Sequence, residues 1–448
     1  MNVAHIFRSY DIRGMYGKDL DEKIMERIGA AFGTFIKTEK VAVANDVRAS
    51  SLPLKKAFIA GLLRTGKHIT DAGTLPLGAG MLYAWKHGME FAYITASHLP
   101  KEWNGVKFFH TSGEGFAERE NYAVRNIFFE GKTGTAKKGT ATEISNASIL
   151  SDYVAFLSQK IRAKKKLRVV LDAGNGCAGL VARELFDKAG FAVTAIFETP
   201  DGAFPNRDPE PNEDPLNELK RVVREKKADM GIAYDGDGDR MVVVDDTGRT
   251  IPPEYMAFFM LTFLLEKQNG PIVANVECTQ LIDDVGKKFH RDIIRVPVGH
   301  TFLVQAALKR GAAFGVETSG HYIIPSLLPF DDSLAVSLYA AHALSLRPGS
   351  LSSFIEKIPA YHFKRINVEC SDEAKFTVIK QMEKTLKKEY DVSTLDGIRI
   401  SLPHGWALIR ASNTSPLIRL SIEAKTNDAL KKYERTFAGL LKDAIGKV

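Results

Sequence analysis

The sequence predicts an α/β fold: three related α/β domains with mixed or parallel sheets, and a C-terminal α+β domain, around a central cleft. Short apolar or β-branched runs alternate with helical periodicity through most of the 448 residues, as in βαβ units. Three of these runs end in polar loops, in the segments FAYITASHLP, MGIAYDGDGDR and AAFGVETSGHY. Ligand sites of open α/β sheets lie outside the carboxyl ends of the strands, so the three loops are expected to face one cleft.

The expected elements follow in chain order. Buried strands are expected at residues 41–44, 91–95, 167–171, 192–197, 230–234, 272–276 and 312–316. Amphipathic helices between them are expected at residues 152–165, 180–189 and 217–226. After Pro359 the pattern changes, because strands at 365–368, 398–402, 407–410 and 417–423 lie around a helix at 373–390.

Three candidate boundaries divide the chain. Residues 132–142 are rich in Gly, Thr and Lys and precede a helix, residues 245–248 form a turn followed by two prolines, and Pro359 marks the change of pattern. The expected domains are therefore 1–148, 149–248, 249–360 and 361–448.

Composition excludes several classes of protein. A 45% hydrophobic and 26% charged chain is ordinary globular protein, and three cysteines exclude a disulfide framework or a cysteine-built zinc site. The N-terminus has no apolar stretch of the kind found in signal peptides, and the longest apolar run, residues 255–265, is too short to span a membrane. The net charge of +7 is spread along the chain. We therefore expect a cytoplasmic protein with neither nucleic acid nor membrane as partner, and monomer and homodimer stay open.

A glycine-rich turn suggests one alternative function. Gly174, Gly176 and Gly179 match the G-x-G-x-x-G pattern between a strand and a helix, and Glu198 ends the next strand. This pattern is typical of dinucleotide binding, although a tight structural turn needs the same small residues. No other motif supplies hydride-transfer chemistry, so an NAD-dependent dehydrogenase remains a remote alternative.

The segment DGDGDR predicts a metal site. Asp235, Asp237 and Asp239 alternate with glycines, so the backbone can curl and bring three carboxylates together. Three close carboxylates repel unless a cation balances them. Arg240 stands where an EF-hand loop needs glycine, and strands flank the motif. An all-oxygen site with few protein ligands suits Mg²⁺.

The segment TASHLP predicts a phosphoryl carrier. Ser97 follows a buried strand, and no G-x-S-x-G elbow of a hydrolase surrounds it. A hydroxyl beside carboxylate-bound Mg²⁺ can carry a phosphoryl group, with the cation balancing its charge. Lys107, a little further along, could hold phosphate or act as an acid or base.

Two further polar segments suggest sugar and phosphate binding. The stretch RASNTSP, with Arg419 beyond it, combines guanidinium, hydroxyl and amide donors of the kind that bind phosphate. The stretch ETSGH offers an acceptor and mixed donors suited to sugar hydroxyls, and His300 lies in a similar polar turn. An ordinary polar hairpin or strand end explains each stretch equally well when it is taken alone.

Taken together, these loops resemble the α-D-phosphohexomutase superfamily, and in particular its phosphomannomutase/phosphoglucomutase branch. The opening FRSYDIRG, the turn NDVRASS, the four loops TASHLP, DGDGDR, ETSGH and RASNTSP, and the segments FPN and PEP occur in the family's order along the whole chain. The resemblance implies four domains around a deep cleft. It also implies a Mg²⁺-dependent isomerase that interconverts 1-phospho and 6-phospho hexoses through phosphorylated Ser97, with a hexose 1,6-bisphosphate as intermediate and activator.

The resemblance also implies roles for single residues. Catalytic roles fall on Ser97, His98, Lys107, Arg240 and His300. The expected Mg²⁺ ligands are Asp235, Asp237, Asp239 and the phosphate of Ser97. The expected sugar-binding residues are Tyr10, Arg13, Glu317, Ser319 and His321. The expected phosphate-binding residues are Arg410, Ser412, Asn413, Thr414 and Arg419.

The chain departs from the family pattern at three positions. Leu99 stands where most members have Asn, Glu277 where close relatives carry Lys, and Ser415 where Glu is frequent. Glu277 would remove or reverse one positive contact near the substrate. Two alternatives within the resemblance therefore stay open: a phosphoglucosamine mutase, against which YDIRG and FPN argue, and a non-catalytic paralogue that binds sugar phosphates.

Overall fold

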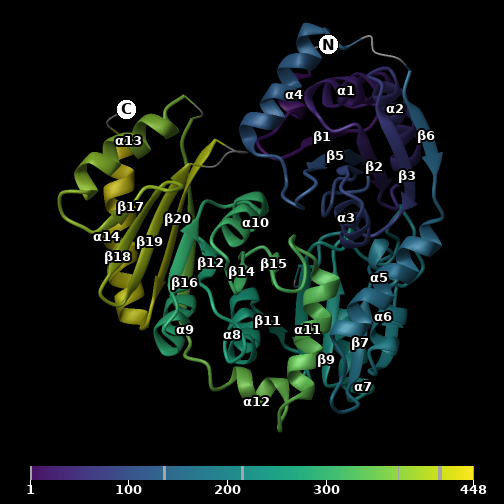
Figure 1. The fold of residues 1–448 in the computed structure, drawn as a ribbon. Helices are drawn as coiled ribbons and strands as arrows, with labels where there is room; N and C mark the ends of the chain where they lie inside the picture. Colours follow the sequence, from purple (N-terminus) through teal and green to yellow (C-terminus); the bar gives the residue numbers. More distant parts are fainter. Residues whose placement is uncertain (1–2, 135–137, 213–215, 372, 412–415, 447–448) are drawn as a thin grey trace.

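The computed structural model of this chain describes residues 3–134, 138–212, 216–371, 373–411 and 416–446. These residues contain four β-sheets, which follow one another in an arc from the N-terminal part (purple) to the C-terminal part (yellow) in Figure 1. The predicted class, three α/β units followed by an α+β unit, is confirmed.

The first sheet has six strands in the order β1-β5-β4-β2-β3-β6. β2 is parallel to β3 and β4, β3 is parallel to β6, and β5 is antiparallel to both β4 and β1. The strands are β1 (Ile12–Met15), β2 (Lys40–Asn45), β3 (His68–Thr74), β4 (Glu90–Ile94), β5 (Trp103–Phe109) and β6 (Thr140–Glu143). The helices are α1 (Glu22–Phe35), α2 (Ser51–Leu63), α3 (Leu77–Lys86) and α4 (Glu118–Glu130).

The second sheet has five strands in the order β11-β10-β9-β7-β8. The strands are β7 (Arg168–Asp172), β8 (Ala192–Ile196), β9 (Met230–Tyr234), β10 (Met241–Asp245) and β11 (Thr250–Ile251). The helices are α5 (Asn146–Lys160), α6 (Ala182–Lys188) and α7 (Asn217–Glu225).

The third sheet has four strands in the order β13-β12-β14-β15. The strands are β12 (Ile272–Asn275), β13 (Ile293–Val296), β14 (Phe314–Val316) and β15 (Tyr322–Ile323). The helices are α8 (Pro253–Leu264), α9 (Leu281–Phe289), α10 (His300–Lys309), α11 (Ser333–Ser345) and α12 (Leu351–Ile355).

One four-strand arrangement recurs in these three sheets. In each, a central strand (β2, β7 or β12) is parallel to the two strands that follow it in the chain. The last of these three (β4, β9 or β14) is also antiparallel to the next strand, β5, β10 or β15. The polar loops singled out in the sequence lie after β4, β9 and β14 in every case, so each loop occupies the equivalent position in its sheet.

The fourth sheet is entirely antiparallel, in the order β16-β20-β19-β18-β17. Its strands are β16 (His362–Glu369), β17 (Val392–Ser393), β18 (Ile398–Leu402), β19 (Gly405–Ala411) and β20 (Leu417–Ala424). Two helices, α13 (Lys375–Leu386) and α14 (Asn427–Ile445), pack against it and share a separate hydrophobic core with it.

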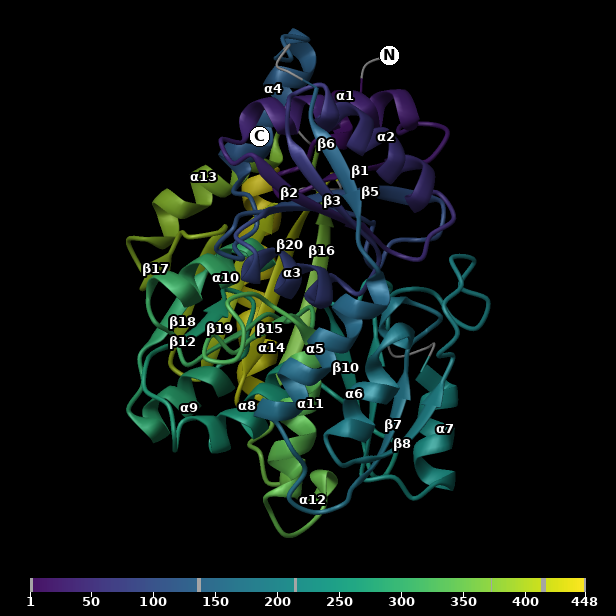
Figure 2. The ribbon, with the colours of Figure 1, turned by 45° about the vertical axis from the view of Figure 1, so that its right-hand side comes forward.

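The largest core extends from the first sheet and joins the second and third sheets. Helix α11 lies between them in Figures 1 and 2 and is apolar on every side. Its hydroxyl side chains are bonded to the second unit, since Ser333 donates to the Asp239 carbonyl and Ser337 bonds with Tyr234. A helix that is hydrophobic all round is buried in a larger protein. This helix therefore fixes the loop after β9 relative to the third sheet.

Two details differ from the sequence expectation. The helix predicted at 152–165 is α5 and runs over Asn146–Lys160, because Ile161 turns into the core with an extended backbone (φ −129°, ψ 119°). The stretch 132–142, expected as a linker, ends in β6, which adds a parallel edge strand to the first sheet.

Candidate active site

Ser97 lies against the acidic loop that follows β9. Its Oγ donates a hydrogen bond of 2.8 Å to Asp235 Oδ2, and its backbone φ of 52° lies in the left-handed region, which residues other than glycine rarely adopt. The Thr95 hydroxyl accepts from the Ser97 backbone N–H at 2.8 Å. Strain of this kind persists only where the surroundings over-determine it, and it concentrates at functional sites.

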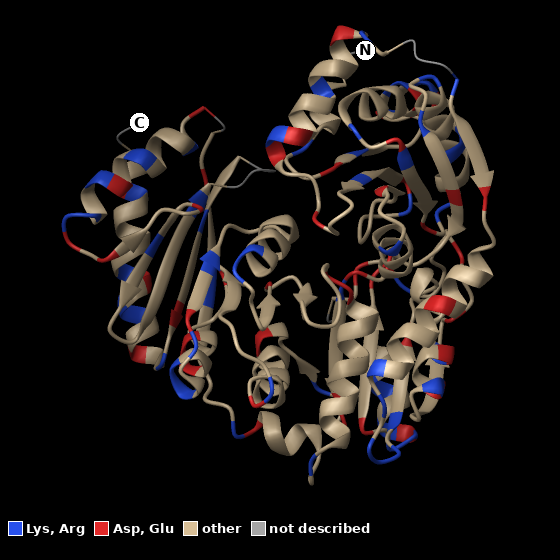
Figure 3. Cartoon of the chain, viewed as in Figure 1, with Lys and Arg blue, Asp and Glu red and all other residues tan. Residues whose placement is uncertain are grey.

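Three carboxylates converge beside Ser97. Asp235, Asp237 and Asp239 are at most 1% exposed, and each offers an oxygen within 4.8 Å of the others. In Figure 3 acidic residues gather between α3 and the end of β9. Burial and the two neighbouring carboxylates raise the pKa of Asp235 well above its usual range. Like charges this close favour a bound cation.

Lys107 supplies part of the balancing charge. Its ammonium donates to Asp237 Oδ2 at 3.1 Å and to Asp239 Oδ2 at 2.6 Å. Burial opposes ionisation of Asp239, but Lys107 and the other cationic groups around this carboxylate, Arg240 among them, together lower the pKa of Asp239. The Oδ1 atoms of Asp237 and Asp239 are buried and have no hydrogen-bond partner among the described residues. Unpartnered carboxylate oxygens fit a divalent cation with oxygen ligands.

The glycines of this loop are required by close packing. Gly238 has a φ of 80°, and a Cβ on Gly236 would lie 2.7 Å from the Ser97 carbonyl oxygen. Asp235 Oδ1 accepts from the N–H groups of Gly238, Asp239 and Arg240 at 3.0–3.1 Å. The loop therefore curls around one carboxylate while the other Asp235 oxygen faces Ser97.

The loop after β14 supplies a second polar group. Ser319 donates to Glu317 Oε1 at 3.0 Å, and Glu317 Oε2 is buried without a partner among the described residues. His321 Nδ1 lies 2.8 Å from Asp331 Oδ2, and its Nε2 accepts from Arg240 Nε at 2.9 Å. Because both ring nitrogens are engaged, the predicted sugar contact of His321 has no free nitrogen to make it.

Three further predicted residues of the first unit lie at different places: His98 and Arg13 contact the serine loop, whereas Tyr10 lines a separate cavity. His98 Nδ1 lies 3.4 Å from Ser97 Oγ, and burial together with the charges of Arg240 and Arg13 lowers the His98 pKa to about 2. Arg13 donates to the Ala96 carbonyl at 3.2 Å. Tyr10 lines a cavity of about 690 Å³ whose wall also includes Arg410. His98 is therefore a neutral neighbour of the serine.

The predicted phosphate-binding residues are only partly described. Ser412, Asn413 and Thr414 lie outside the described residues. Arg410 and Arg419 face each other across β19 and β20. Arg410 donates to Asp396 at 2.8 Å, and its Nη1 lies 3.8 Å from Glu277, which also pairs with Arg365 at 3.3 Å. The carboxylate at position 277 thus faces two arginines of the fourth unit.

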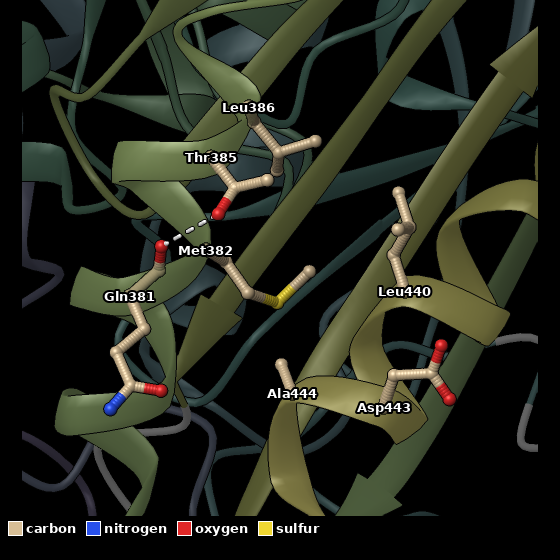
Figure 4. Close-up of a pocket in the computed structure, with 7 residues that line it drawn as sticks. All are labelled: Gln381, Met382, Thr385, Leu386, Leu440, Asp443 and Ala444. Atoms are coloured by element: carbon tan, nitrogen blue, oxygen red, sulfur yellow. Dashed lines mark hydrogen bonds between the residues drawn. The ribbon is translucent and has the colours of Figure 1, made fainter. Parts of the chain in front are cut away.

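A cavity of about 710 Å³ joins the third and fourth units. It is lined by Glu317 and Ser319 from the third unit, by Arg365 and Arg419 from the fourth, and by Glu277. The pocket in Figure 4 is different in kind: it encloses about 160 Å³ between α13 and α14, and Asp443 is the one charged residue among those that line it. The larger cavity carries the donors that a phosphorylated sugar needs.

Comparison with known proteins decides the family. Four models of phosphoglucomutase/phosphomannomutase match in order: α/β/α domain I at residues 4–135, domain II at 151–248, domain III at 252–361 and the C-terminal domain at 366–440.

The chain belongs to the phosphoglucomutase/phosphomannomutase family.

Individual relatives agree with this assignment. The phosphoglucomutase/phosphomannomutase of Thermococcus kodakarensis is 32% identical, with 99% of this chain and 100% of the relative covered. A probable phosphoglucosamine mutase of Methanothermobacter thermautotrophicus is also 32% identical, with 98% of each covered. A crystal structure of a family member from Burkholderia thailandensis superimposes with a TM-score of 0.90 at 28% identity, covering 98% and 97% of the two chains. The chain is thus an α-D-phosphohexomutase, an isomerase of the phosphomannomutase/phosphoglucomutase type.

Sequence reasoning missed the residue that holds the serine loop of this phosphohexomutase. Arg48 is 2% exposed and donates to the carbonyls of Ser97, Leu99, Pro100 and Trp103 at 2.6–3.2 Å, while its Nε pairs with Asp46. Position 99 thus contributes its backbone to this network, and Leu there leaves the network intact. The turn NDVRASS was visible in the sequence, but nothing in it indicated which loop the arginine would reach.

The glycine-rich turn after β7 packs against the acidic loop that follows β9. Gly176 could not carry a Cβ, which would lie 2.8 Å from the Gly236 carbonyl oxygen, and the Cys177 N–H donates to that oxygen at 3.0 Å. A Cβ on Gly174 would collide with Arg207, which pairs with Asp172. These glycines serve close packing, the structural alternative to dinucleotide binding.

No helix among the described residues is long and apolar enough to cross a membrane.

Proposed function

We propose that this protein interconverts the 1-phosphate and 6-phosphate of a hexose by transferring a phosphoryl group to and from Ser97. The single observation that carries the proposal is the hydrogen bond between Ser97 Oγ and Asp235 within a cluster of three buried carboxylates. Mg²⁺ held by Asp235, Asp237 and Asp239 would neutralise phosphate charge at this point. The two unpartnered oxygens of Asp237 and Asp239 support this ligand set.

In the first half-reaction the bond between Ser97 Oγ and phosphorus breaks while a hydroxyl of the sugar phosphate bonds to that phosphorus. The hydroxyl proton must pass to a base, and Ser97 Oγ must gain a proton as it leaves phosphorus. In the second half-reaction Ser97 Oγ gives up its proton as it bonds to the other phosphoryl group, and the sugar oxygen that is released gains one. Lys107, Arg240 and the loop amides offer donors to the transferring group, which carries its charge on oxygen. The intermediate is a hexose 1,6-bisphosphate. Between the two steps it must reverse its orientation in the cleft, so that its other phosphoryl group faces Ser97.

We propose that domains 1–148, 149–248, 249–360 and 361–448 each supply one loop: serine, metal, sugar and phosphate. Arg410 and Arg419, with residues 412–414, would bind the phosphate that is not being transferred. Glu317 and Ser319 would bind ring hydroxyls. The cytoplasm is the proposed location, since all three cysteines are free and buried, as in a reducing compartment.

Mannose and glucose phosphates are the proposed substrates. A site that binds the sugar in both orientations makes few contacts that depend on the configuration at C2, the one centre at which the two sugars differ. A second candidate, a glucosamine phosphate, is favoured by the charge of the 710 Å³ cavity: five glutamates line it with two arginines, which suits a cationic amino group. The glutamates are Glu210, Glu254, Glu277, Glu317 and Glu423. Coupled assays with the three sugar 1-phosphates and catalytic bisphosphate decide between the candidates.

Intact-mass analysis tests the carrier residue. We expect an adduct of about 80 Da on part of the purified protein, the mass of one phosphoryl group. Ser97→Ala should lose the adduct and nearly all mutase activity, whereas the control Ser148→Ala, at an exposed helix start, should keep both. An unmodified and fully active Ser97→Ala protein would rule out the phosphoserine mechanism, and activity of neither protein on any sugar phosphate would favour the non-catalytic paralogue.

A further inference from the structure

Asp331 is a buried carboxylate to which the sequence assigned no role. It is 3% exposed, lies two residues before α11, and faces two histidines of the third unit. We infer that Asp331 is a positioning residue that fixes the tautomer of His321 and thereby aims the Arg240 guanidinium at the phosphoryl group on Ser97. This inference rests on the proposed function, since it needs phosphoryl transfer at Ser97.

The hydrogen bonds determine one tautomer. Arg240 Nε carries a proton at every accessible pH, so it donates to His321 Nε2, which must present a lone pair. The imidazole proton then lies on Nδ1, which donates to Asp331 Oδ2 at 2.8 Å. The opposite tautomer or an imidazolium would place two protons between His321 Nε2 and Arg240 Nε. The hydrogen bonds from Arg240 to His321 and from His321 to Asp331 can therefore form together in one state only, in which His321 is neutral and Asp331 is ionised.

Asp331 stays ionised in its buried position. Burial opposes its ionisation, but His300 and the hydrogen bond from His321 outweigh burial and lower the pKa of Asp331. His300 Nδ1 lies 3.3 Å from the same Oδ2, and its ring stacks on that of His321 with centroids 5.1 Å apart. The stacked His300 ring also restricts rotation of the His321 ring. Asp331 Oδ2 thus contacts the rings of both His300 and His321.

These two hydrogen bonds hold the Arg240 side chain in place. Its Nε is held by His321 and its backbone N–H by Asp235, while neither Nη donates a hydrogen bond to another described residue. The guanidinium charge is close enough to His98 and Asp235 to affect the pKa of both. The two Nη groups of Arg240, which have no hydrogen-bond partner among the described residues, are a fork of the kind that binds phosphate oxygens bidentately. Asp331 acts on that fork through His321 and need not touch the substrate.

A double-mutant cycle and one spectroscopic readout test the inference. We expect Asp331→Ala to lower kcat about 100-fold, the effect of a misplaced catalytic group, with KM changed less than threefold. The double variant Asp331→Ala/Arg240→Ala should have the same kcat as Arg240→Ala alone, because both substitutions abolish the same contribution of Arg240 to catalysis. Asp331→Asn, which keeps an acceptor for Nδ1–H, should recover most of kcat. Additive effects in the double variant would overturn the inference.

Histidine-selective ¹⁵N NMR of the full chain reports the tautomer directly. Wild-type His321 should be neutral with its proton on Nδ1, and Asp331→Ala should shift the proton toward Nε2. An Nε2–H tautomer or an imidazolium in the wild type would refute the inference. If Asp331→Ala does not fold, the same spectrum of Asp331→Asn, which should retain the Nδ1–H tautomer, decides the question.

Asp332→Asn is the matched control. This neighbouring carboxylate is also buried but caps α11 and bonds with Tyr153, away from His321. It should leave kcat and the His321 tautomer unchanged, and a loss as large as that of Asp331→Ala would show a merely structural effect of this segment. Failure of the proposed function is distinguishable, because the tautomer of His321 can be read in a protein that shows no mutase activity and no phosphate on Ser97.

Discussion

We predict that Lys107 competes with Mg²⁺ for the acidic loop, so that removing Lys107 should tighten Mg²⁺ binding. The ammonium bonds to one oxygen each of Asp237 and Asp239, at 3.1 and 2.6 Å, with both carboxylates fully buried. Lys107→Met removes this cation and changes the formal charge of Lys107 with the three aspartates from −2 to −3. Breaking a buried ion pair costs about 3–5 kcal/mol. The metal-free variant should therefore be less stable than the metal-free wild type by that amount.

Mg²⁺ should restore much of this loss. Ligand binding to the native state stabilises it by RT ln(1 + [L]/Kd), so a stability gap that closes on adding metal reports a lower Kd. If Mg²⁺ binding becomes more favourable by a third of the lost ion-pair energy, about 1.4 kcal/mol, the Kd for Mg²⁺ falls about tenfold. Turnover should nevertheless fall, because Lys107 also offers a donor to the transferring group.

Calorimetric Mg²⁺ titration and thermal unfolding with and without EDTA measure these effects. Lys55→Met is the control, because Lys55 is equally buried and pairs with Asp71 at 2.6 Å outside the acidic loop. It should lose stability by the same amount with and without Mg²⁺. Unchanged or weaker Mg²⁺ binding by Lys107→Met would refute the competition between ammonium and metal.

Three further predictions follow from single contacts. Gly236→Ala places a Cβ 2.7 Å from the Ser97 carbonyl oxygen, so phosphate incorporation measured by intact mass should fall sharply while the fold measured by circular dichroism persists. Burial raises the pKa of Asp332 to about 6, so the contribution of Asp332 to the free energy of unfolding should fall by about 3 kcal/mol as pH rises from about 4 through 6. Asp332→Asn should remove that slope in urea unfolding, and equal slopes would contradict it. Arg410→Ala should lower kcat/KM by roughly 10- to 150-fold on glucose and mannose phosphates alike, since a charged contact contributes about 1.5–3 kcal/mol; a strong effect on one epimer alone would show that Arg410 reads the sugar.

The pattern of strands and loops was predictable because it depends on local sequence. The buried strand 230–234 was predicted to the residue, and it ends where apolar residues give way to Asp235. The clustering of carboxylates in the acidic loop was predictable because its aspartates and glycines are adjacent in the chain. Helix α5 was misplaced because its C-terminal end depends on burial of Ile161, which local periodicity does not reveal.

The sequence by itself thus determined the fold class and the three strand-end loops, and it predicted a chemistry for each loop. Tertiary structure alone decided which distant residues contact these loops: Arg48 contacts the serine loop, Gly176 packs against the acidic loop, and Asp331 bonds with His321. The physical reason is that the partners of a buried charge, and the backbone segments that pack closely together, come from parts of the chain that are distant in sequence and meet only in the fold. Both ring nitrogens of His321 are engaged for that reason, by partners 10 and 81 residues away.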